Sequence, residues 1–332
     1  MLMLSDMTVG QADKVAEKVV EMFLRESDIL QDLPFDNAVS PSGGSTLVYG
    51  YVQEKLPSSA AFRAIGSEYT PSNATVKELT TILRIFGGSF QIDRVLKSIE
   101  SKIENMDRQT KQKVRGAVQL FHDTMINGDT ASNSLGFDGL DKFLVGTKTE
   151  YNTDSYIDLS TDANLKANAS IFYEWLKKLI NATNADALLV NDDMKTKIES
   201  VAAYLGYKTQ SEEAFGRKYT KVGDVKLCDL KNKVILTDDN GTTVATEEPI
   251  IGVKTRTISS NSITGLTDIY AVKYGIDDGF HGVTITGDKA IEAYLPDFTQ
   301  PGAVKTGEVE MIAAVVLKSS NSAGVLRNIK IK

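Results

Sequence analysis

A segment running from Asp107 to Asn127 constrains the fold most, because its apolar residues recur at the spacing of a helix with one buried face. The apolar stripe consists of Val114, Ala117, Val118, Phe121 and Met125. The opposite face carries Arg108, Lys111, Lys113, Arg115, Gln119 and Asp123. Asn127-Gly128 is expected to end the helix, since both residues suit the left-handed conformation that follows a helix terminus. A helix of about 20 residues is roughly 30 Å long, which is enough to form the spine of a flat domain.

The segments on both sides of this helix form an ordered series. A strand expected to end at Gly87-Gly88 and the run 90–94 (FQIDR) precede it, and 136–140 (GFDGL) follows after Asn127-Gly128-Asp129. The segment from Gly307 to Ile329 closes the series. In their order and spacing, these segments resemble the major capsid proteins of tailed bacteriophages, whose fold is the Hong Kong 97 type. The Phe-Asp-Gly-Leu after the helix is the most telling piece, and the resemblance covers most of the chain.

The resemblance implies an α+β fold of the Hong Kong 97 type. Its parts would be a long spine helix, a β-rich peripheral domain, an α/β axial domain, an extended hairpin called the E-loop, and an N-terminal arm. On this chain the arm would be 1–30, the E-loop 46–86, the axial domain 148–275, and the peripheral domain 31–45, 87–147 and 276–332.

Hydrophobic periodicity predicts elements that suit these parts. Strand-like runs at 46–52 and 76–86 flank a long polar excursion, and compact domains rarely keep such loops without a function. Residues 161–180 and the stripe from Met194 to Leu205 predict two helices, with a short buried strand at 186–191 between them. Further strands are expected at 225–230, 233–236, 248–257, 269–274, 283–286, 291–295 and 310–318. The last of these is expected to pack against the spine helix.

Contacts between subunits are what the resemblance implies for the hairpin and the arm. The candidate interface residues are Phe23, Tyr49, Tyr51, Lys55, Phe62, Arg63, Glu68, Tyr69, Lys77 and Arg84. Taken singly, each of these charges is better explained as a solvated position, because exposed ion pairs contribute little to stability.

The first 30 residues show a modest amphipathic pattern. Thr8-Val9-Gly10-Gln11 has the form of a capping box, and it is followed by a stripe of Val15, Val19, Met22 and Phe23. Periodicity alone favours a helix packed on its own domain, whereas the resemblance implies an arm that reaches neighbouring subunits. Because no long charged preface precedes this arm, we expect a separate scaffolding protein and little or no maturation cleavage.

Residues suited to catalysis are few, with two histidines and one cysteine in 332 residues. His122 is expected to flank the buried stripe. His281, near Asp277 and Asp278, is a candidate general base or metal ligand, but a turn residue is the favoured interpretation. Cys228 alternates with apolar neighbours and is interpreted as a small core residue. We therefore predict a protein that is not an enzyme, with no catalytic residues, no metal and no cofactor.

The net charge of −7 disfavours a protein that grips DNA, since such proteins are normally basic. The resemblance implies a subunit that self-assembles, as pentamers and hexamers, into the icosahedral shell of a virion. The shell would enclose double-stranded DNA without reading its sequence. It would assemble in the cytoplasm of a bacterial host, with a portal and a decoration protein as further partners. No apolar run approaches the roughly 20 residues of a membrane helix. Two alternatives stay open: an encapsulin-type compartment shell, and a small-molecule-binding α/β protein.

Overall fold

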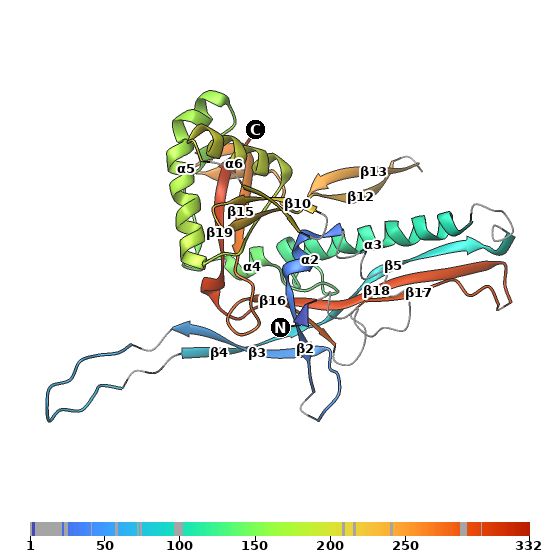
Figure 1. The fold of residues 1–332 in the computed structure, drawn as a ribbon, viewed down its shortest axis with the longest axis horizontal. Helices are drawn as coiled ribbons and strands as arrows, with labels where there is room; N and C mark the ends of the chain where they lie inside the picture. The colour runs from blue at the N-terminus through green and yellow to red at the C-terminus, as the bar shows by residue number, and fades with distance from the viewer. Residues whose placement is uncertain are drawn as a thin grey trace.

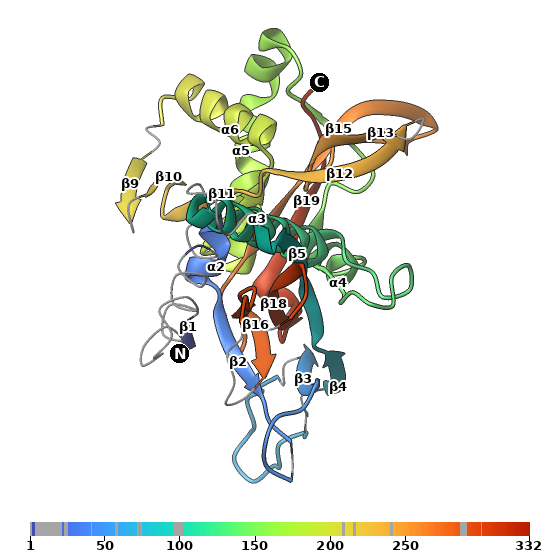
Figure 2. The same cartoon turned by 90° about the vertical axis from the view of Figure 1, so that its right-hand side faces the viewer.

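The computed structural model shows an elongated molecule in which one long helix lies between two large sheets (Figures 1 and 2). The structure describes residues 2–3, 22, 26–40, 42–56, 59–71, 73, 75–95, 102–207, 210–214, 217–239, 242–285, 291–299 and 301–332. Most of the expected arm, including Thr8–Gln11, Val15, Val19 and Phe23, therefore lies outside the described residues.

The long helix is α3 (Lys102–Asn127), which begins earlier than the sequence predicts and ends where expected. The five stripe residues from Val114 to Met125 are at most 3% exposed, so the predicted buried face is confirmed. The reason given for its end is wrong, because Gly128 does not adopt a positive φ. A Cβ at this position would lie 2.2 Å from the carbonyl oxygen of Phe137, so glycine is required by the close approach of the following loop.

The sheet beneath α3 has the strand order β1-β2-β16-β18-β17, and β5 pairs with β18. Its strands are β1 (Leu2–Met3), β2 (Pro34–Ala38), β5 (Arg84–Asp93), β16 (Phe280–Ile285), β17 (Ile291–Tyr294) and β18 (Val304–Leu317). The prediction that the strand near 310–318 packs on the spine helix is confirmed, because Val309 and Met311 share one core with Phe121 and Met125.

Strand β5 runs through Gly87-Gly88, where the sequence suggested that a strand ends. A Cβ on Gly87 would lie 1.9 Å from the carbonyl oxygen of Val309. The glycine therefore allows the close pairing of β5 with β18 and does not terminate the strand.

The second sheet has the order β6-β19-β15-β8-β11-β10-β9, with β14 beside β15 and β7 beside β19. Its strands are β6 (Glu150–Tyr151), β7 (Ile157–Asp158), β8 (Ala187–Val190), β9 (Gln210–Ala214), β10 (Arg217–Val222), β11 (Val225–Asp229), β14 (Lys254–Ile258), β15 (Asn261–Val272) and β19 (Ala323–Lys330). Helices α5 (Asp162–Thr183) and α6 (Asp192–Tyr204) pack on this sheet.

The predicted helix–strand–helix run is present in α5, β8 and α6. Asn191 caps α6 as expected, since its side chain accepts a hydrogen bond from the backbone N–H of Met194 at 2.8 Å. Thr161, which the sequence analysis did not assign, caps α5 in the same way.

Three segments that the sequence analysis treated as single units contain strands that belong to different sheets. The run 76–86 divides at Leu83 into β4 (Thr75–Ile82) and β5, and 248–257 divides into β13 (Thr242–Pro249) and β14. The C-terminal strand β19 lies in the nine-stranded sheet and not beneath the spine helix. The assignment of all of 276–332 to one peripheral domain therefore disagrees with the strand pairing.

Shorter elements complete the described chain. They are α2 (Asp28–Asp32), α4 (Leu140–Leu144), η3 (Ser320–Ser322) and a projecting hairpin of β12 (Asn232–Asp239) and β13. The β12–β13 hairpin is tied to the spine helix by an ion pair of 3.1 Å between Lys233 and Asp123. Among the described residues, no helix has the length and apolar character needed to span a membrane.

Candidate subunit interface

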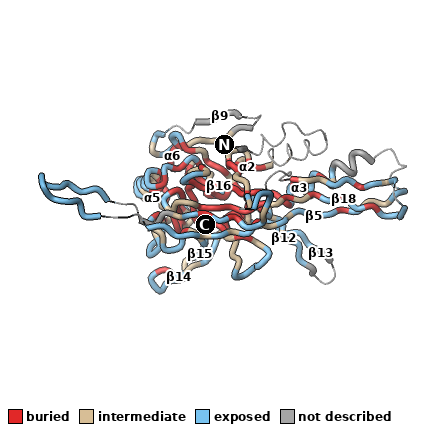
Figure 3. Tube along the Cα trace, turned by 90° about the horizontal axis from the view of Figure 1, so that it is seen from below, coloured by how far each residue is buried: buried red, intermediate tan, exposed pale blue. Residues whose placement is uncertain are grey.

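A second hairpin, formed by β3 (Val48–Leu56) and β4, extends away from both large sheets (Figure 1). The two strands are antiparallel and pair from Val48–Ile82 at the root to Leu56–Thr75 toward the tip. Figure 3 shows this extension as exposed along its outer half, in contrast to the buried interior of the body. The described residues 59–71 are therefore not packed against the body of their own subunit, since each of them is exposed.

The root of the hairpin is anchored in the body. Tyr49 and Tyr51 are each only 9% exposed, and they share a small core with Leu83 and Val316. The Tyr49 hydroxyl donates a 2.6 Å hydrogen bond to Asp36 Oδ2, and burial together with this carboxylate raises the pKa of Tyr49. The two tyrosines, predicted as interface residues, thus use their side chains within the subunit and offer little area to a neighbour.

The tip of the hairpin, which we define as residues 59–71, is exposed throughout. Phe62 and Ile65 have relative exposures of 108% and 105%, and Tyr69 of 60%. The Arg63 guanidinium lies 5.4 Å from the centroid of the Tyr69 ring, and it donates to the carbonyl of Ser67 at 3.3 Å. Three large apolar or aromatic side chains exposed on one projecting segment make the tip a candidate surface for binding another molecule.

The other predicted interface residues are dispersed. Glu68 lies on the tip with Phe62, Arg63 and Tyr69, and Lys77 is exposed on β4. Arg84 is part of β5 and half-buried. Lys55 belongs to β3, but its side chain lies outside the described residues, as does the whole of Phe23.

The sequence analysis did not include Ile65 among the candidate interface residues, although it is fully exposed on the tip. The signal was present, because Ile65 is one of few apolar residues within a run of polar and small ones. An apolar residue in such a run has no helix or strand face to occupy, so its exposure could be expected from the sequence.

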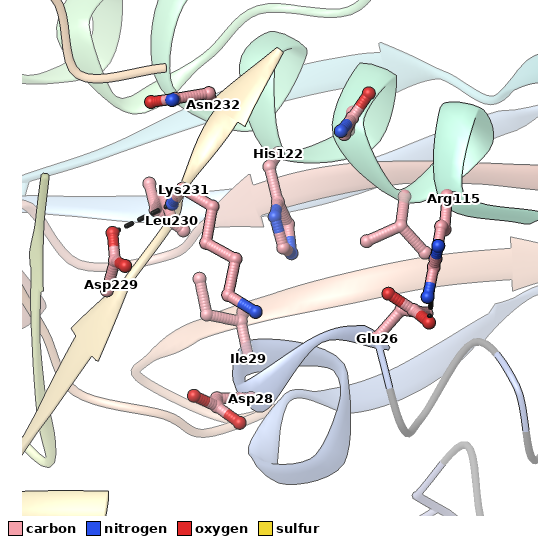
Figure 4. A pocket seen from close by; sticks show the side chains of 11 residues that line it. Glu26, Asp28, Ile29, Arg115, His122, Asp229, Leu230, Lys231 and Asn232 are labelled. Atoms are coloured by element: carbon pink, nitrogen blue, oxygen red, sulfur yellow. Dashed lines mark hydrogen bonds and ion pairs between the residues drawn. The ribbon is translucent and has the colours of Figure 1, made fainter. Parts of the chain in front are cut away.

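A separate cavity of about 290 Å³ lies between α2, α3 and the end of β11 (Figure 4). His122 faces it and is buried, with Nε2 2.7 Å from the Ser27 hydroxyl oxygen, and burial lowers its pKa to about 4. Across the cavity, Glu26 and Arg115 form an ion pair of 3.0 Å, and burial raises the pKa of Asp229. His122 is thus a neutral packed residue at pH 7, as the stripe predicted.

The remaining residues considered for chemistry are also packed. His281 lies within strand β16 and is fully buried, so the interpretation as a turn residue is wrong. Its ring packs against the Tyr49 ring at the hairpin root in a T-shaped arrangement, with the two ring centroids 6.2 Å apart. Cys228 is buried, as expected, and burial raises the pKa of its thiol to about 12. In the part of the chain that the structure describes, no three His, Cys, Asp or Glu side chains are grouped to hold a metal ion.

Comparison with known proteins places the fold. No family model and no curated protein matches the chain. Among solved structures, the SrpI encapsulin complex of Synechococcus elongatus PCC 7942 aligns over 99% of this chain and 96% of its own, with a TM-score of 0.57 and 10% identity. The capsid of an empty GTA particle and a structure of Mycobacterium phage Bobi each align over 92% of this chain and 90% of their own, with TM-scores of 0.51 and identities of 10% and 12%.

At identities of 10–12%, the structural likeness establishes the fold alone. The chain has the α+β, Hong Kong 97-type fold of capsid and encapsulin shells, and the predicted fold class is confirmed.

Proposed function

We propose that this chain is the major capsid protein of a tailed bacteriophage, which self-assembles into an icosahedral shell around double-stranded DNA. The observation that carries the proposal is the β3–β4 hairpin, whose apolar tip projects with no covering from its own subunit. The fold supports it, since subunits of a phage and of a GTA capsid share it over more than nine-tenths of this chain.

In this proposal the parts of the molecule have separate roles. The β3–β4 hairpin is the E-loop that lies over an adjacent subunit, and 1–30 is the arm. The sheet beneath α3 forms the peripheral domain. The axial domain consists of α5, α6 and the nine-stranded sheet, to which β19 belongs.

Assembly follows from identical subunits that present the same patches repeatedly. Closed symmetry, with pentamers and hexamers, satisfies every patch at once. Fully burying an aromatic or branched apolar side chain contributes roughly 1.5–3 kcal/mol. Burial of Phe62, Ile65 and Tyr69 at the tip therefore contributes a modest free energy of association per subunit. The contribution recurs in every copy of the subunit in the shell.

We also propose which proteins act with the shell and where the shell is found. A separate scaffolding protein, a portal and a decoration protein act with the shell, which assembles in the bacterial cytoplasm and is found in the virion. The net charge of −7 suits a container that encloses DNA without sequence-specific binding. The role is structural, and we assign it no catalytic residue, metal or cofactor.

A second candidate is an encapsulin-type shell that holds protein cargo. The specific observation in its favour is the alignment with the SrpI encapsulin over 99% of this chain, with a TM-score of 0.57. The two candidates share the assembly mechanism and differ in what the particle contains.

The test replaces residues 57–74 by Asn-Gly, which joins the paired Leu56 and Thr75 through a two-residue hairpin turn. We expect negative-stain microscopy to show regular shells of the unaltered protein. The shortened variant should give folded, unassembled subunits, as judged by circular dichroism and sedimentation. A matched control keeps the whole loop and changes Glu174, an exposed residue on α5, to Gln. Normal shells from the shortened variant would remove the basis of the proposal. Nucleic acid or protein in particles purified from the native source then decides between phage capsid and encapsulin.

A further inference from the structure

The hairpin of β12 and β13 projects from the body beside the spine helix, and one of its edges is open (Figures 1 and 3). Its strands form a two-stranded sheet of their own, in which Asn232–Asp239 pairs with Thr242–Pro249. β12 contacts α3, whereas β13 pairs with β12 alone among the described strands. A two-stranded sheet is only marginally stable in water, and an open edge presents backbone groups to which another strand can pair.

The side chains of this hairpin are suited to a larger sheet. Leu236 is 68% exposed, Val234 45% and Val244 41%. All five residues from 244 to 248 on β13 are exposed. Val and Thr have a high strand propensity because they pack well against neighbours on adjacent strands. The segment 244–246 contains no lysine and no proline, which are residues that commonly protect an open edge.

The sequence of β13 matches itself when two copies are related by a two-fold axis at Ala245. The two strands are then antiparallel, and Val244 faces Thr246 of the second copy, which is a favourable β-branched pair. Glu247 of the second copy faces position 243, so the two Glu247 residues are about 13 Å apart along the strand. An axis at Glu247 would instead place two carboxylates directly opposite each other, which is destabilising.

The pairing within each hairpin extends this match across four strands. Ile235 lies opposite Thr246, and Thr237 lies opposite Val244. With the axis at Ala245, the row of side chains that crosses β12, β13 and their two copies therefore consists of Ile235, Thr246, Val244 and Thr237. All four are β-branched, and a second row related by the axis repeats them in reverse order. Cross-strand pairs of this kind stabilise a sheet.

The other face of the same sheet is also complementary. Leu236 lies opposite Ala245 within the hairpin. In the four-stranded sheet two alanines therefore meet at the axis, with a leucine on each side of them. The small alanine side chains leave room for the leucines to fold over them. Apolar area of Leu236 that is exposed in the single subunit would thus be removed from water.

We propose that β13 pairs with β13 of a second copy of this chain, about a two-fold axis at Ala245. The resulting sheet has the order β12-β13-β13-β12 and spans two subunits. The contact is isologous, because both subunits use the same surface, and each subunit makes one such contact. This inference rests on the proposed function and names a contact between shell subunits that is separate from the hairpin tip.

A single cysteine tests where the axis lies. Directly opposed residues of antiparallel strands have Cα atoms about 4.5–5.5 Å apart, a distance that a disulfide can bridge. Ala245→Cys shells, treated with a mild thiol oxidant and separated under denaturing conditions, should therefore give a covalent dimer. The control is Glu248→Cys, exposed on the same strand, whose two copies would lie about 20 Å apart and should stay monomeric. Native Cys228 is buried, so the unaltered protein serves as the blank.

Charge exchange tests the contact in a way that a purely structural effect would not reproduce. Ala245→Glu and Ala245→Lys each place two like charges at the axis, and each should raise the subunit concentration needed for shell formation by about tenfold or more. An equimolar mixture of the two variants allows every contact to pair Glu with Lys and should assemble at a lower concentration than either variant alone. Ala167→Glu, the same exchange at an exposed position of α5, is the control and should leave assembly unchanged.

The outcomes separate this inference from the proposed function. Regular shells in which Ala245→Cys gives no more covalent dimer than Glu248→Cys would overturn the pairing of β13 and leave the shell function standing. A mixture of the Glu and Lys variants that assembles no better than either alone would do the same. If the unaltered chain formed no shell, the proposed function would be refuted, and this inference with it. Should either charge variant fail to fold by circular dichroism, the two cysteine variants decide.

Discussion

The buried charges around Arg327 connect the nine-stranded sheet to the segment that follows the spine helix. Arg327 Nε donates to Glu150 Oε1 at 2.8 Å, and Nη1 contacts a carboxylate oxygen of Asp141 on α4 and lies 3.4 Å from Asp268 Oδ2. The arginine side chain is 10% exposed. The variant Arg327→Met keeps an apolar stem of similar length and removes the charge.

The size of the effect follows from what is left behind. Removing one partner of a buried ion pair destabilises a protein by roughly 3–5 kcal/mol, because the other charge stays buried. Arg256 still holds Asp268 through contacts of 2.6 and 2.5 Å, so we expect the lower end, about 3 kcal/mol. At roughly 2 °C per kcal/mol for a large chain, the Tm should fall by about 6 °C.

The measurement is differential scanning calorimetry on the variant in which Asn-Gly replaces residues 57–74. This variant is expected to stay unassembled, so assembly does not shift its Tm. The matched control is Arg115→Met, which removes an arginine pair with Glu26 whose arginine side chain is 61% exposed. Exposed pairs of this kind contribute about 0–1 kcal/mol. Equal Tm changes in the two variants would refute the view that burial makes the Arg327 cluster important.

The same cluster predicts a pH dependence. Burial acts to raise the pKa of Asp141, but the hydrogen bond and charge of Arg327 outweigh burial and hold the pKa below its ordinary value. A carboxylate with a depressed folded pKa stabilises the protein above its unfolded pKa of about 3.9, and this stability is lost as the pH falls through the folded value. The Tm difference between Arg327→Met and the parent should therefore shrink below about pH 4, and a constant difference down to pH 3 would contradict this explanation.

Three further predictions concern the core and the hairpin root. Gly87→Ala should lower the free energy of unfolding by about 1–3 kcal/mol or more, because its new Cβ would clash with the backbone of β18. Gly88→Ala should be tolerated, because its Cβ would meet only the flexible side chain of Lys113. Chemical denaturation of both variants measures the difference. His122 has a folded pKa of about 4 against an ordinary 6.5, so the unfolded chain is protonated first as the pH falls. The free energy of unfolding should therefore decrease by about 2 kcal/mol between pH 7.5 and pH 5. Calorimetry over this range should show that His122→Gln abolishes the decrease. Tyr49→Phe should broaden the distribution of particle sizes in micrographs, because it removes the 2.6 Å hydrogen bond that orients the hairpin root.

The sequence predicts best where burial follows a single local period. The stripe of α3 could be assigned because each of its residues packs on the same side at a spacing of 3.6, whatever the partner. Asn191 could be assigned because a cap depends only on the first turn of its helix.

Elements defined by a distant partner could not be predicted. The division at Leu83 arises because β4 pairs with β3 while β5 pairs with β18, and nothing local marks the exchange. The same holds for Tyr49, which was predicted to contact a neighbouring subunit, because its hydrogen-bond partner Asp36 lies on a separate strand.

The contrast between the root and the tip of the hairpin suggests how one sequence controls both the strength and the geometry of an assembly. The root is fixed by Tyr49, by the burial of Tyr51 and by a 3.1 Å hydrogen bond from Gln53 to the carbonyl of Leu317 on β18. Within the tip, Arg63 donates to the carbonyl of Ser67 and lies over the Tyr69 ring, and the residues from 59 to 71 are all exposed. A heterologous contact forms rings when its rotation closes and open filaments when it does not. In the proposed shell, we expect the anchored root to set that rotation relative to the spine helix and its sheet, and the apolar tip to set the affinity, so that the two properties can vary independently.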